Sequence, residues 1–230
     1  MVMARFKDLC LDSDEPSTLA RFWAAALSLE PASRHDDGVV RLPLGPRGSA
    51  TTLGINPVRE FRTGKTRVHL DLRLADPEPS ALIGAGASVL STPGENGWWV
   101  LADPDGNAFC AFPPNGSRPG VEKLIVDSRD PEAQARWWSG ITGGDIDHSQ
   151  GGSALVGAEG FPWRYWLFDP VPEPKTVKNR LHWDVDLLSA DPAPLIAAGA
   201  TVLREPSGDV GWWVLADPEG NEFCAYPRSA

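Results

Sequence analysis

The octapeptide GWWVLADP occupies residues 97–104 and recurs without a change at residues 211–218. The agreement extends further, because residues 97–114 and 211–228 are identical at 14 of 18 positions. Two adjacent tryptophans inside eight repeated residues indicate an internal duplication with a period of about 114 residues, which is far longer than a solenoid repeat. Each copy has the size of a small domain. We therefore expect two modules, residues 1–114 and 121–230, joined by a linker at residues 115–120.

Composition limits the class of protein. Hydrophobic residues make up 42% of the 230 residues and charged residues 23%, as in ordinary globular proteins. The formal net charge of −10 and the lack of a basic cluster argue against a nucleic-acid or membrane partner. No apolar stretch approaches the roughly 18 residues of a membrane-spanning helix, and residues 1–7 do not resemble a signal peptide. Three cysteines, two of them at equivalent positions of the repeat, predict reduced thiols and a cytoplasmic protein.

The hydrophobic pattern of the first copy predicts strands at residues 6–12, 38–44, 51–56, 66–74, 88–90, 98–102 and 108–112. A helix is expected to open at Glu15-Pro16, and a short one at Asp76-Pro77 that ends at the glycines of residues 84–86. The second copy repeats this order. Each copy thus contains two βαβββ units, and we predict an α+β fold of curved mixed sheets with helices on the outer face.

Several motifs in this order resemble the vicinal oxygen chelate superfamily, which includes glyoxalase I, extradiol dioxygenases, fosfomycin-resistance enzymes and bleomycin-resistance proteins. They are an ARFW segment in the first helix, a VHLD strand at residues 68–71, and the hairpin DPDGN at residues 103–107. Residues 178–184 and 217–224 look more closely like its glyoxalase-like domain branch. The resemblance covers both copies and implies the two-module fold of that superfamily.

The resemblance also implies where a metal would bind. Metal-dependent members place a His or Gln on the first strand, a His on the first strand of the second unit, and a Glu near the end of the last strand. The matching residues are Asp8, His69 and Cys110 in the first copy, and Lys123, His182 and Cys224 in the second. A lysine ammonium has no lone pair to offer. We therefore expect no metal and no cofactor; a non-standard site of Asp8, His69 and Cys110 is the alternative.

The strand at residues 66–74 carries the candidate catalytic groups. Because side chains alternate along a strand, His69, Asp71 and Arg73 are expected on the concave face, opposite to Val68 and its apolar neighbours. The second copy repeats the pattern with His182, Asp184 and Asp186. A His-x-Asp pair can act as a general base or hold a ligand by hydrogen bonds. It can equally be a structural network within the sheet.

Ten tryptophans suggest an aromatic binding surface. Trp23, Trp137 and Trp138 are expected in the core beneath the helices. In the pairs Trp98-Trp99 and Trp212-Trp213, one ring should face the helices and the other the concave side, near Phe112. Trp163 and Tyr165 are expected to share a face. The alternative is that the tryptophan pairs only pack the modules together, and we interpret Cys110 and Cys224 as inert structural thiols.

Three functions fit these residues. The first, which we favour, is metal-independent binding or sequestration of an aromatic or apolar small molecule in a tryptophan-lined concave cavity. The second is a lyase, isomerase or cyclase that uses His69–Asp71 or His182–Asp184 as acid and base. The third is a metal-dependent glyoxalase- or dioxygenase-type enzyme. The sequence leaves open whether the protein is an enzyme, and it predicts modules paired within one chain, with a homodimer undecided.

Overall fold

The computed structural model describes residues 2–29, 33–34, 38–44, 51–59, 64, 67–208 and 210–228. The first copy contains β1 (Ala4–Ser13), α1 (Pro16–Ala26), β2 (Ser33–Arg34), β3 (Val40–Pro43), β4 (Thr52–Pro57), β5 (Val68–Arg73), α2 (Ser80–Gly84), β6 (Ser88–Ser91), β7 (Trp99–Ala102) and β8 (Ala108–Phe112). The second contains β9 (Gly120–Ser128), α3 (Pro131–Thr142), β10 (Asp145–Asp147), β11 (Ser153–Val156), β12 (Tyr165–Pro170), β13 (Leu181–Leu187), α4 (Ala193–Ala197), β14 (Thr201–Arg204), β15 (Trp213–Ala216) and β16 (Glu222–Tyr226).

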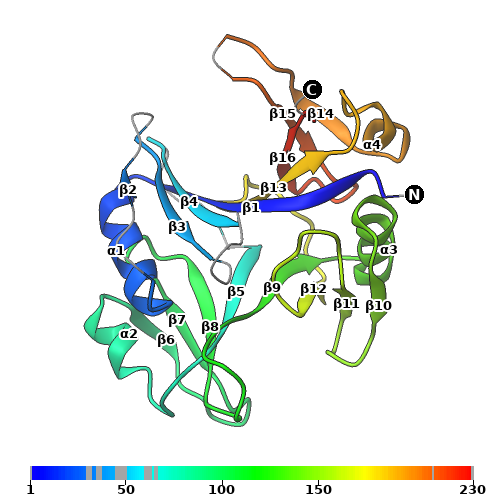
Figure 1. Ribbon diagram of the computed structural model, residues 1–230. Helices are drawn as coiled ribbons and strands as arrows, with labels where there is room; N and C mark the ends of the chain where they lie inside the picture. The colour runs from blue at the N-terminus through cyan, green and yellow to red at the C-terminus, as the bar shows by residue number, and fades with distance from the viewer. Residues whose placement is uncertain are drawn as a thin grey trace.

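The strands form two mixed sheets, and each sheet draws one βαβββ unit from each copy (Figure 1). Sheet A has the order β14-β15-β16-β13-β1-β4-β3-β2, and sheet B has the order β10-β11-β12-β9-β5-β8-β7-β6. The copies meet where β1 runs antiparallel to β13 in sheet A, and where β5 runs antiparallel to β9 in sheet B. Strand pairing therefore interleaves the two copies.

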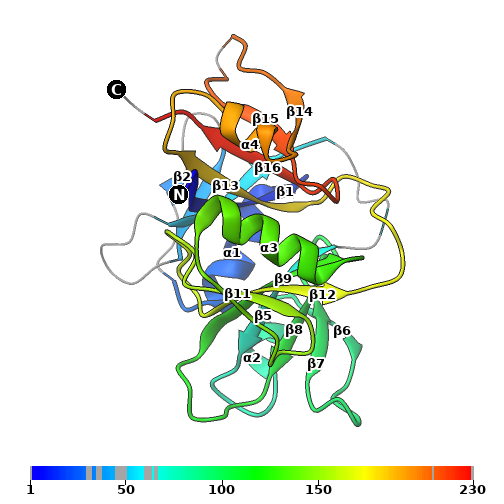
Figure 2. The ribbon, with the colours of Figure 1, turned by 90° about the vertical axis from the view of Figure 1, so that its right-hand side faces the viewer.

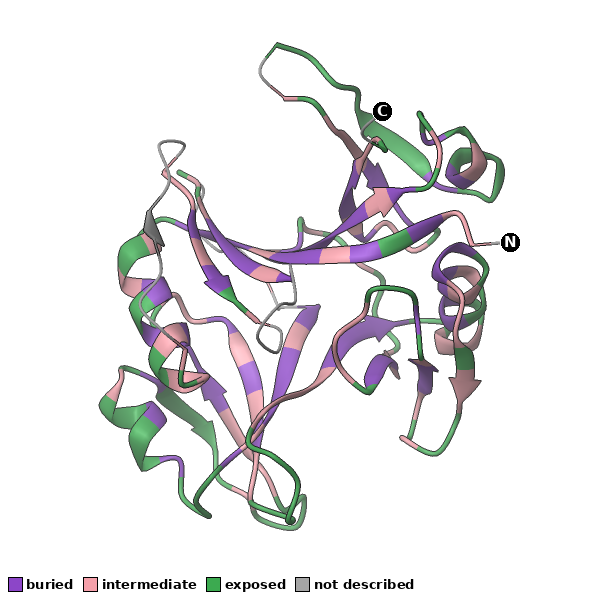
Figure 3. Ribbon diagram, viewed as in Figure 1, coloured by how far each residue is buried: buried purple, intermediate pink, exposed green. Residues whose placement is uncertain are grey.

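The two sheets curve away from each other, with their convex faces turned toward a shared interior. Helices α1 and α3 lie between the sheets, as Figures 1 and 2 show from two sides. One hydrophobic cluster runs through this interior and includes Leu9 and Leu53 of sheet A with Leu70 and Leu124 of sheet B. Figure 3 shows that buried positions recur along the central strands of both sheets. The concave faces of sheets A and B, called face A and face B below, point in opposite directions.

The repeated Asp-Pro hairpin fixes each long helix in this interior. Asp103 accepts hydrogen bonds from the backbone N–H groups of Asp105 and Asn107, and from Trp23 Nε1 on α1 at 3.2 Å. Asp217 does the same in the second copy, where Trp138 Nε1 of α3 donates at 3.3 Å and a glutamine side chain adds a bond. The first helix of each copy is thus bound to the last hairpin of the same copy, across the gap between the sheets.

The structure places the start of α3 at its Asp-Pro step, but α2 starts later than its Asp-Pro step predicts. Pro131 opens α3 behind Asp130, whose side chain accepts the N–H of Ala133. The short helix predicted at Asp76-Pro77 begins instead at Ser80. Pro79 lacks an N–H and disfavours helical geometry at the residue before it, and the chain bends at residues 75–78 instead.

Some strands differ from the pattern. Strand β5 begins at Val68, and Thr66, where the sequence pattern starts this strand, lies outside the described residues. The chain enters a bend at Trp163, so β12 starts at Tyr165. Strands β10 and β11 complete one edge of sheet B, and β14 completes one edge of sheet A. No helix in the described part of the chain has the length and apolar character to cross a membrane.

Candidate functional site

A β-bulge in the first strand of each copy turns two successive charged side chains away from the core. In β1, Phe6 and Leu9 are both buried in the core, and the pairing with β13 shifts between them. Lys7 and Asp8 therefore project onto face A. In β9 the pairing with β5 shifts in the same way next to Glu122 and Lys123. The order of charges is reversed between the two bulges.

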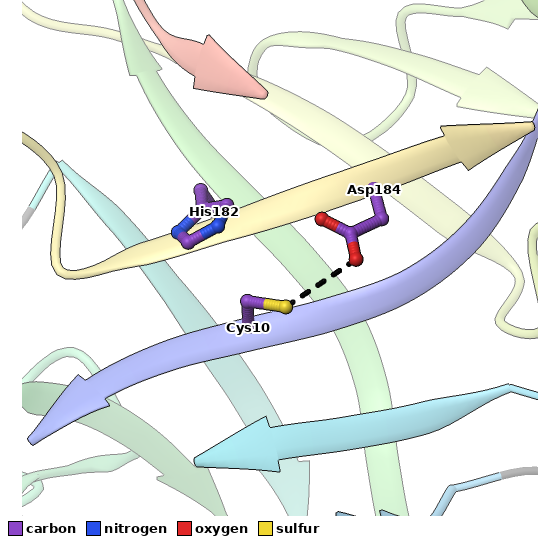
Figure 4. A group of neighbouring side chains, drawn as sticks. All are labelled: Cys10, His182 and Asp184. Carbon is purple, nitrogen blue, oxygen red and sulfur yellow. Dashed lines mark hydrogen bonds between the residues drawn. The ribbon is translucent and has the colours of Figure 1, made fainter. Parts of the chain in front are cut away.

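Face A gathers four side chains that can act as metal ligands or acid–base groups. Cys10 lies opposite His182 across the β1–β13 pair, and Asp184 lies opposite Cys224 across the β13–β16 pair. The Cys10 thiol donates to Asp184 Oδ2 at 3.4 Å (Figure 4), and Cys224 Sγ lies 3.8 Å from His182 Nε2. His182, Asp184 and Cys224 are buried.

Face B gathers the equivalent residues with one difference in charge. His69 Nε2 lies 3.7 Å from Asp71 Oδ1 and 4.0 Å from Cys110 Sγ. Lys123 of the second copy is the cross-strand partner of Asp71. Since Asp8 is the residue equivalent to Lys123, face A has a carboxylate where face B has an ammonium group.

Burial dominates the electrostatics of both faces. It raises the pKa of Asp71 to about 7, although the Lys123 ammonium pulls that pKa down. Burial, followed by the nearby Asp71 carboxylate, raises the pKa of Cys110 to about 12. The pKa values of Cys10 and Cys224 are also raised, again chiefly by burial. The thiols are therefore protonated near neutral pH, and a protonated thiol is a poor nucleophile.

An aromatic pair lines each concave face. Trp98 packs on Phe112 with ring centroids 5.2 Å apart, and Trp212 packs on Tyr226 at the same distance. Their neighbours Trp99 and Trp213 pack instead against the hydrophobic core. One ring of each adjacent pair thus lies on each side of the sheet, which is the arrangement that strand alternation predicts.

Tyr165 belongs to face B, but Trp163 does not. Tyr165 packs with Ile125, Leu167 and a pair of small residues in an apolar cluster separate from the main core. Trp163 packs against Phe6 and the main core. The prediction that Trp163 and Tyr165 share a face was wrong, because the bend at residues 163–164 interrupts the alternation.

The fold also separates the alternative metal set of Asp8, His69 and Cys110. Asp8 lies on β1 of sheet A, whereas His69 and Cys110 lie on sheet B. The two βαβββ units of the first copy lie in different sheets. Counting positions within that copy therefore grouped Asp8 with residues of the other sheet. Asp8 is instead held by Thr52, whose backbone N–H donates at 2.6 Å and hydroxyl at 2.9 Å, and by Lys7 Nζ at 2.7 Å.

These contacts decide whether the superfamily's metal positions fit a metal ion. On face B the positions are Lys123, His69 and Cys110, and an ammonium group excludes a cation there. On face A they are Asp8, His182 and Cys224, but the oxygens of Asp8 already accept three hydrogen bonds. The superfamily's ligand positions therefore do not fit a metal on face B, and on face A three of the roughly four acceptor sites of the Asp8 carboxylate are already used.

The remaining predicted residues interact with other residues of this chain. Arg73 forms an ion pair with Glu122 and donates to the Pro113 carbonyl at 2.7 Å, with its guanidinium 5.2 Å from the Phe112 ring. Asp186, the equivalent of Arg73, lies 3.8 Å from Arg5 at the exposed edge of face A. Trp23 and Trp138 are buried in the core, and Trp137 packs against it.

Sequence patterns missed two contributors to these faces. Cys10 joins the face A cluster from β1, and Lys7 lies over the Tyr226 ring at 5.1 Å. Two adjacent charged residues in an otherwise alternating strand were the signal for the bulge that places Lys7 there. Two open cavities of about 280 and 350 Å³ lie around residues 118–120 and the end of α1. Trp163 lines the first and Arg73 the second, but neither cavity is lined by the His-x-Asp pairs.

Comparisons with known proteins agree with this architecture. The family model described as "Glyoxalase-like domain" matches residues 8–112 and again residues 123–226. The crystal structure of glyoxalase I from Zea mays is 13% identical, with a TM-score of 0.64, 96% of this chain covered and 92% of that chain. The cppA protein from Streptococcus pneumoniae TIGR4 is 14% identical, with a TM-score of 0.51 and 98% of each chain covered.

No curated protein sequence matches the chain. At these low identities, the likeness to solved structures shows the fold alone. The family model covers most of the sequence, and its two matches coincide with the two copies of the repeat. The chain therefore belongs to the glyoxalase-like domain family of the vicinal oxygen chelate superfamily, with two tandem copies of the domain.

Proposed function

We propose that this protein binds a planar, largely apolar small molecule on face B, and that binding there needs no metal ion. The observation that carries the proposal is the placement of the Lys123 ammonium between two rings, 5.9 Å from the centroid of Phe112 and 5.9 Å from that of Tyr165. The guanidinium groups of Arg73 and Arg164 also lie over these two rings, at 5.2 Å from Phe112 and 4.9 Å from Tyr165. Cationic groups beside aromatic and aliphatic surface are the composition of a small-molecule site.

The surrounding side chains suggest how a ligand would be held. Trp98 packs against Phe112 at one side, and the apolar cluster of Ile125, Tyr165 and Leu167 lies at the other. Within the described part of the chain, no hydrogen bond or ion pair occupies the Lys123 ammonium. An acidic group on the ligand would satisfy it, while the rings contact the planar body. Lysine here takes the place of the cation that metal-dependent relatives would bind.

Calorimetric titration with 1-naphthoate and its neutral amide, 1-naphthamide, tests this proposal. The carboxylate should bind the natural protein about tenfold more tightly than the amide, equivalent to about 1.4 kcal/mol. Lys123→Met should remove that preference, and Trp98→Ala should weaken both ligands. Trp212→Ala is the matched control, because it alters the equivalent ring on face A. Equal losses in Trp98→Ala and Trp212→Ala, or no binding of either probe, would contradict the proposal.

The contact between His69 and Asp71 favours acid–base catalysis as a second candidate function. The imidazole and carboxylate lie 3.7 Å apart, beside the ammonium of Lys123. The pKa of Asp71, raised to about 7 by burial, suits proton transfer near neutral pH. If a bound molecule is converted, His69→Gln should abolish turnover while leaving its binding mostly intact. Loss of turnover with His182→Gln but not with His69→Gln would place the reaction on face A.

A further inference from the structure

We propose that the cavity of about 280 Å³ at the end of α1 binds an aliphatic monocarboxylic acid of medium chain length, whose carboxylate contacts Arg118. The cavity lies between α1, the chain around residues 118–120 and the loop before β12. It is on the opposite side of sheet B from face B, because Val121 packs against the main core whereas Lys123 lies on face B. The inference therefore does not depend on the ligand proposed for face B.

The side chains around this cavity are mainly apolar. They include Leu27, Leu29, Leu44, Val121 and Trp163. Each of these residues packs against the main core and is still partly exposed. Apolar surface that a ligand removes from water contributes favourably to binding. The cavity volume is near the lower limit of small-molecule sites, about 300 Å³, so an aliphatic chain of medium length is a suitable occupant.

Arg118 supplies the positive charge that an acid requires. It is exposed, and among the described residues that line the cavity it is the only charged one. Its guanidinium group forms no hydrogen bond or ion pair with another described residue. A guanidinium group can bind a carboxylate through two parallel hydrogen bonds. Arg118 also lines the adjoining cavity of about 350 Å³, but there Asp76 and Glu78 would repel an acid. The acyl chain is therefore assigned to the smaller cavity.

The strand register identifies the equivalent of this position elsewhere in the chain. Gly120 of β9 lies opposite Arg73 of β5, and Arg5 of β1 lies opposite Asp186 of β13. Arg73 and Asp186 are equivalent residues of the repeat, so Gly120 corresponds to Arg5. Counting back two residues from each, position 118 corresponds to position 3.

At position 3 the equivalent space is filled by protein. Met3 packs against the main core, its N–H donates to the Ile141 carbonyl of α3 at 2.8 Å, and its carbonyl accepts the N–H of Leu188 at 2.9 Å. Pro119, next to Arg118, has no N–H, and within the described residues no backbone hydrogen bond joins Arg118 to α1. Core packing accounts for the methionine. It does not account for an exposed arginine beside an open apolar cavity, whereas a bound acid does.

Calorimetric titration of the full chain with octanoate tests this inference. We expect one octanoate per chain, bound about 16-fold more tightly than hexanoate, because each of the two additional buried methylenes contributes about fourfold. Octanamide, which has the same chain without the charge, should bind about fivefold more weakly than octanoate. Arg118→Gln should bind octanoate and octanamide equally well. Leu29→Asn, which places an amide in the apolar wall, should weaken the binding of both.

Arg129→Gln is the matched control, since Arg129 is exposed and lies outside the cavity, and it should bind both ligands as the natural protein does. Lys123→Met should leave octanoate binding unchanged. Loss of octanoate binding in Lys123→Met would place the acid on face B and overturn the inference. Absence of stoichiometric octanoate binding, or a preference for octanoate that survives in Arg118→Gln, would overturn it as well. Because Arg118 is exposed, Arg118→Gln carries the test even if Leu29→Asn does not fold. The naphthoate titration on face B has its own variants, so either inference can fail without the other.

Discussion

Asp71 of the first copy lies directly opposite Lys123 of the second copy, across the seam between β5 and β9. The two residues belong to different copies of the repeat, one to each side of the linker at residues 115–120. Their juxtaposition exists only because sheet B combines the second unit of one copy with the first unit of the other. Each concave face is therefore a joint product of both copies, and neither copy carries a complete site.

The buried carboxyl of Asp71 should make stability fall as the pH rises from about 4 to about 7. Its folded pKa of about 7 lies above the unfolded value of 3.8, so the folded state retains a proton that the unfolded state has already released. At 1.36 kcal/mol per pKa unit, ionisation costs the folded state up to about 4 kcal/mol. Asp71→Asn should lack this loss, as measured by urea unfolding over that pH range.

The difference in unfolding free energy between Asp71→Asn and the natural protein should therefore grow across this window and become constant above pH 7. Asp145→Asn serves as the control, because Asp145 is exposed on β10. A difference that is the same at every pH would show that Asp71 ionises normally in the folded protein.

Removing the Asp217 carboxylate should destabilise the fold by at least about 3 kcal/mol. Asp217→Ala leaves the Trp138 indole N–H and the Gln134 amide without their acceptor in the interior, at about 1–3 kcal/mol each. Asp103→Ala is the matched comparison, since Asp103 accepts from Trp23 but has no counterpart of Gln134. Denaturant unfolding should show a loss about 1 kcal/mol smaller for Asp103→Ala. Equal losses would mean that the glutamine bond contributes nothing.

Gly160 marks a close approach between the two sheets. A Cβ atom at this position would lie 2.3 Å from the Phe6 carbonyl oxygen, and its φ is +79°. Gly151 has a similar φ of +86° but open space around it. Thermal unfolding should show a loss of about 1 kcal/mol for Gly151→Ala from backbone strain alone, and a further 1–3 kcal/mol or so for Gly160→Ala. Equal effects would mean that the β1 backbone moves aside without cost.

Separated copies should not fold as independent monomers. A fragment of residues 1–117 would leave β1 and β5 without their partners β13 and β9, and residues 118–230 would have the same defect. We expect the two fragments to co-purify as a 1:1 complex when expressed together, and each alone to unfold or self-associate. Light scattering coupled to gel filtration measures this. Two stable monomers with cooperative unfolding would contradict the interleaved sheets.

Local patterns predicted which side chains point to the concave faces within regular strands, but not at bends and bulges. Alternation along β5 put His69 and Asp71 on one face, because side-chain direction within a regular strand is a local property. Trp98 and Trp212, directly before β7 and β15, stack toward Phe112 and Tyr226, while Trp99 and Trp213 pack against the core, as alternation predicts. The same rule failed for Trp163, which lies in a bend. It also gave no indication of Cys10, since a bulge in β1 changes the alternation between Phe6 and Leu9.

The duplication, the order of strands and helices, and the Asp-Pro hairpins were determined by the sequence alone, since each depends on residues close together in the chain. Which unit pairs with which was decided only in the tertiary structure. Both copies carry nearly the same local pattern, so β1 is as compatible with β5 as with β13 when judged by alternation. The choice of β13 follows from long-range packing, in which Trp23 and Trp138 bind the hairpins of their own copies while the strands pair with the other copy. That choice brings Asp71 to Lys123, and Cys10 to Asp184.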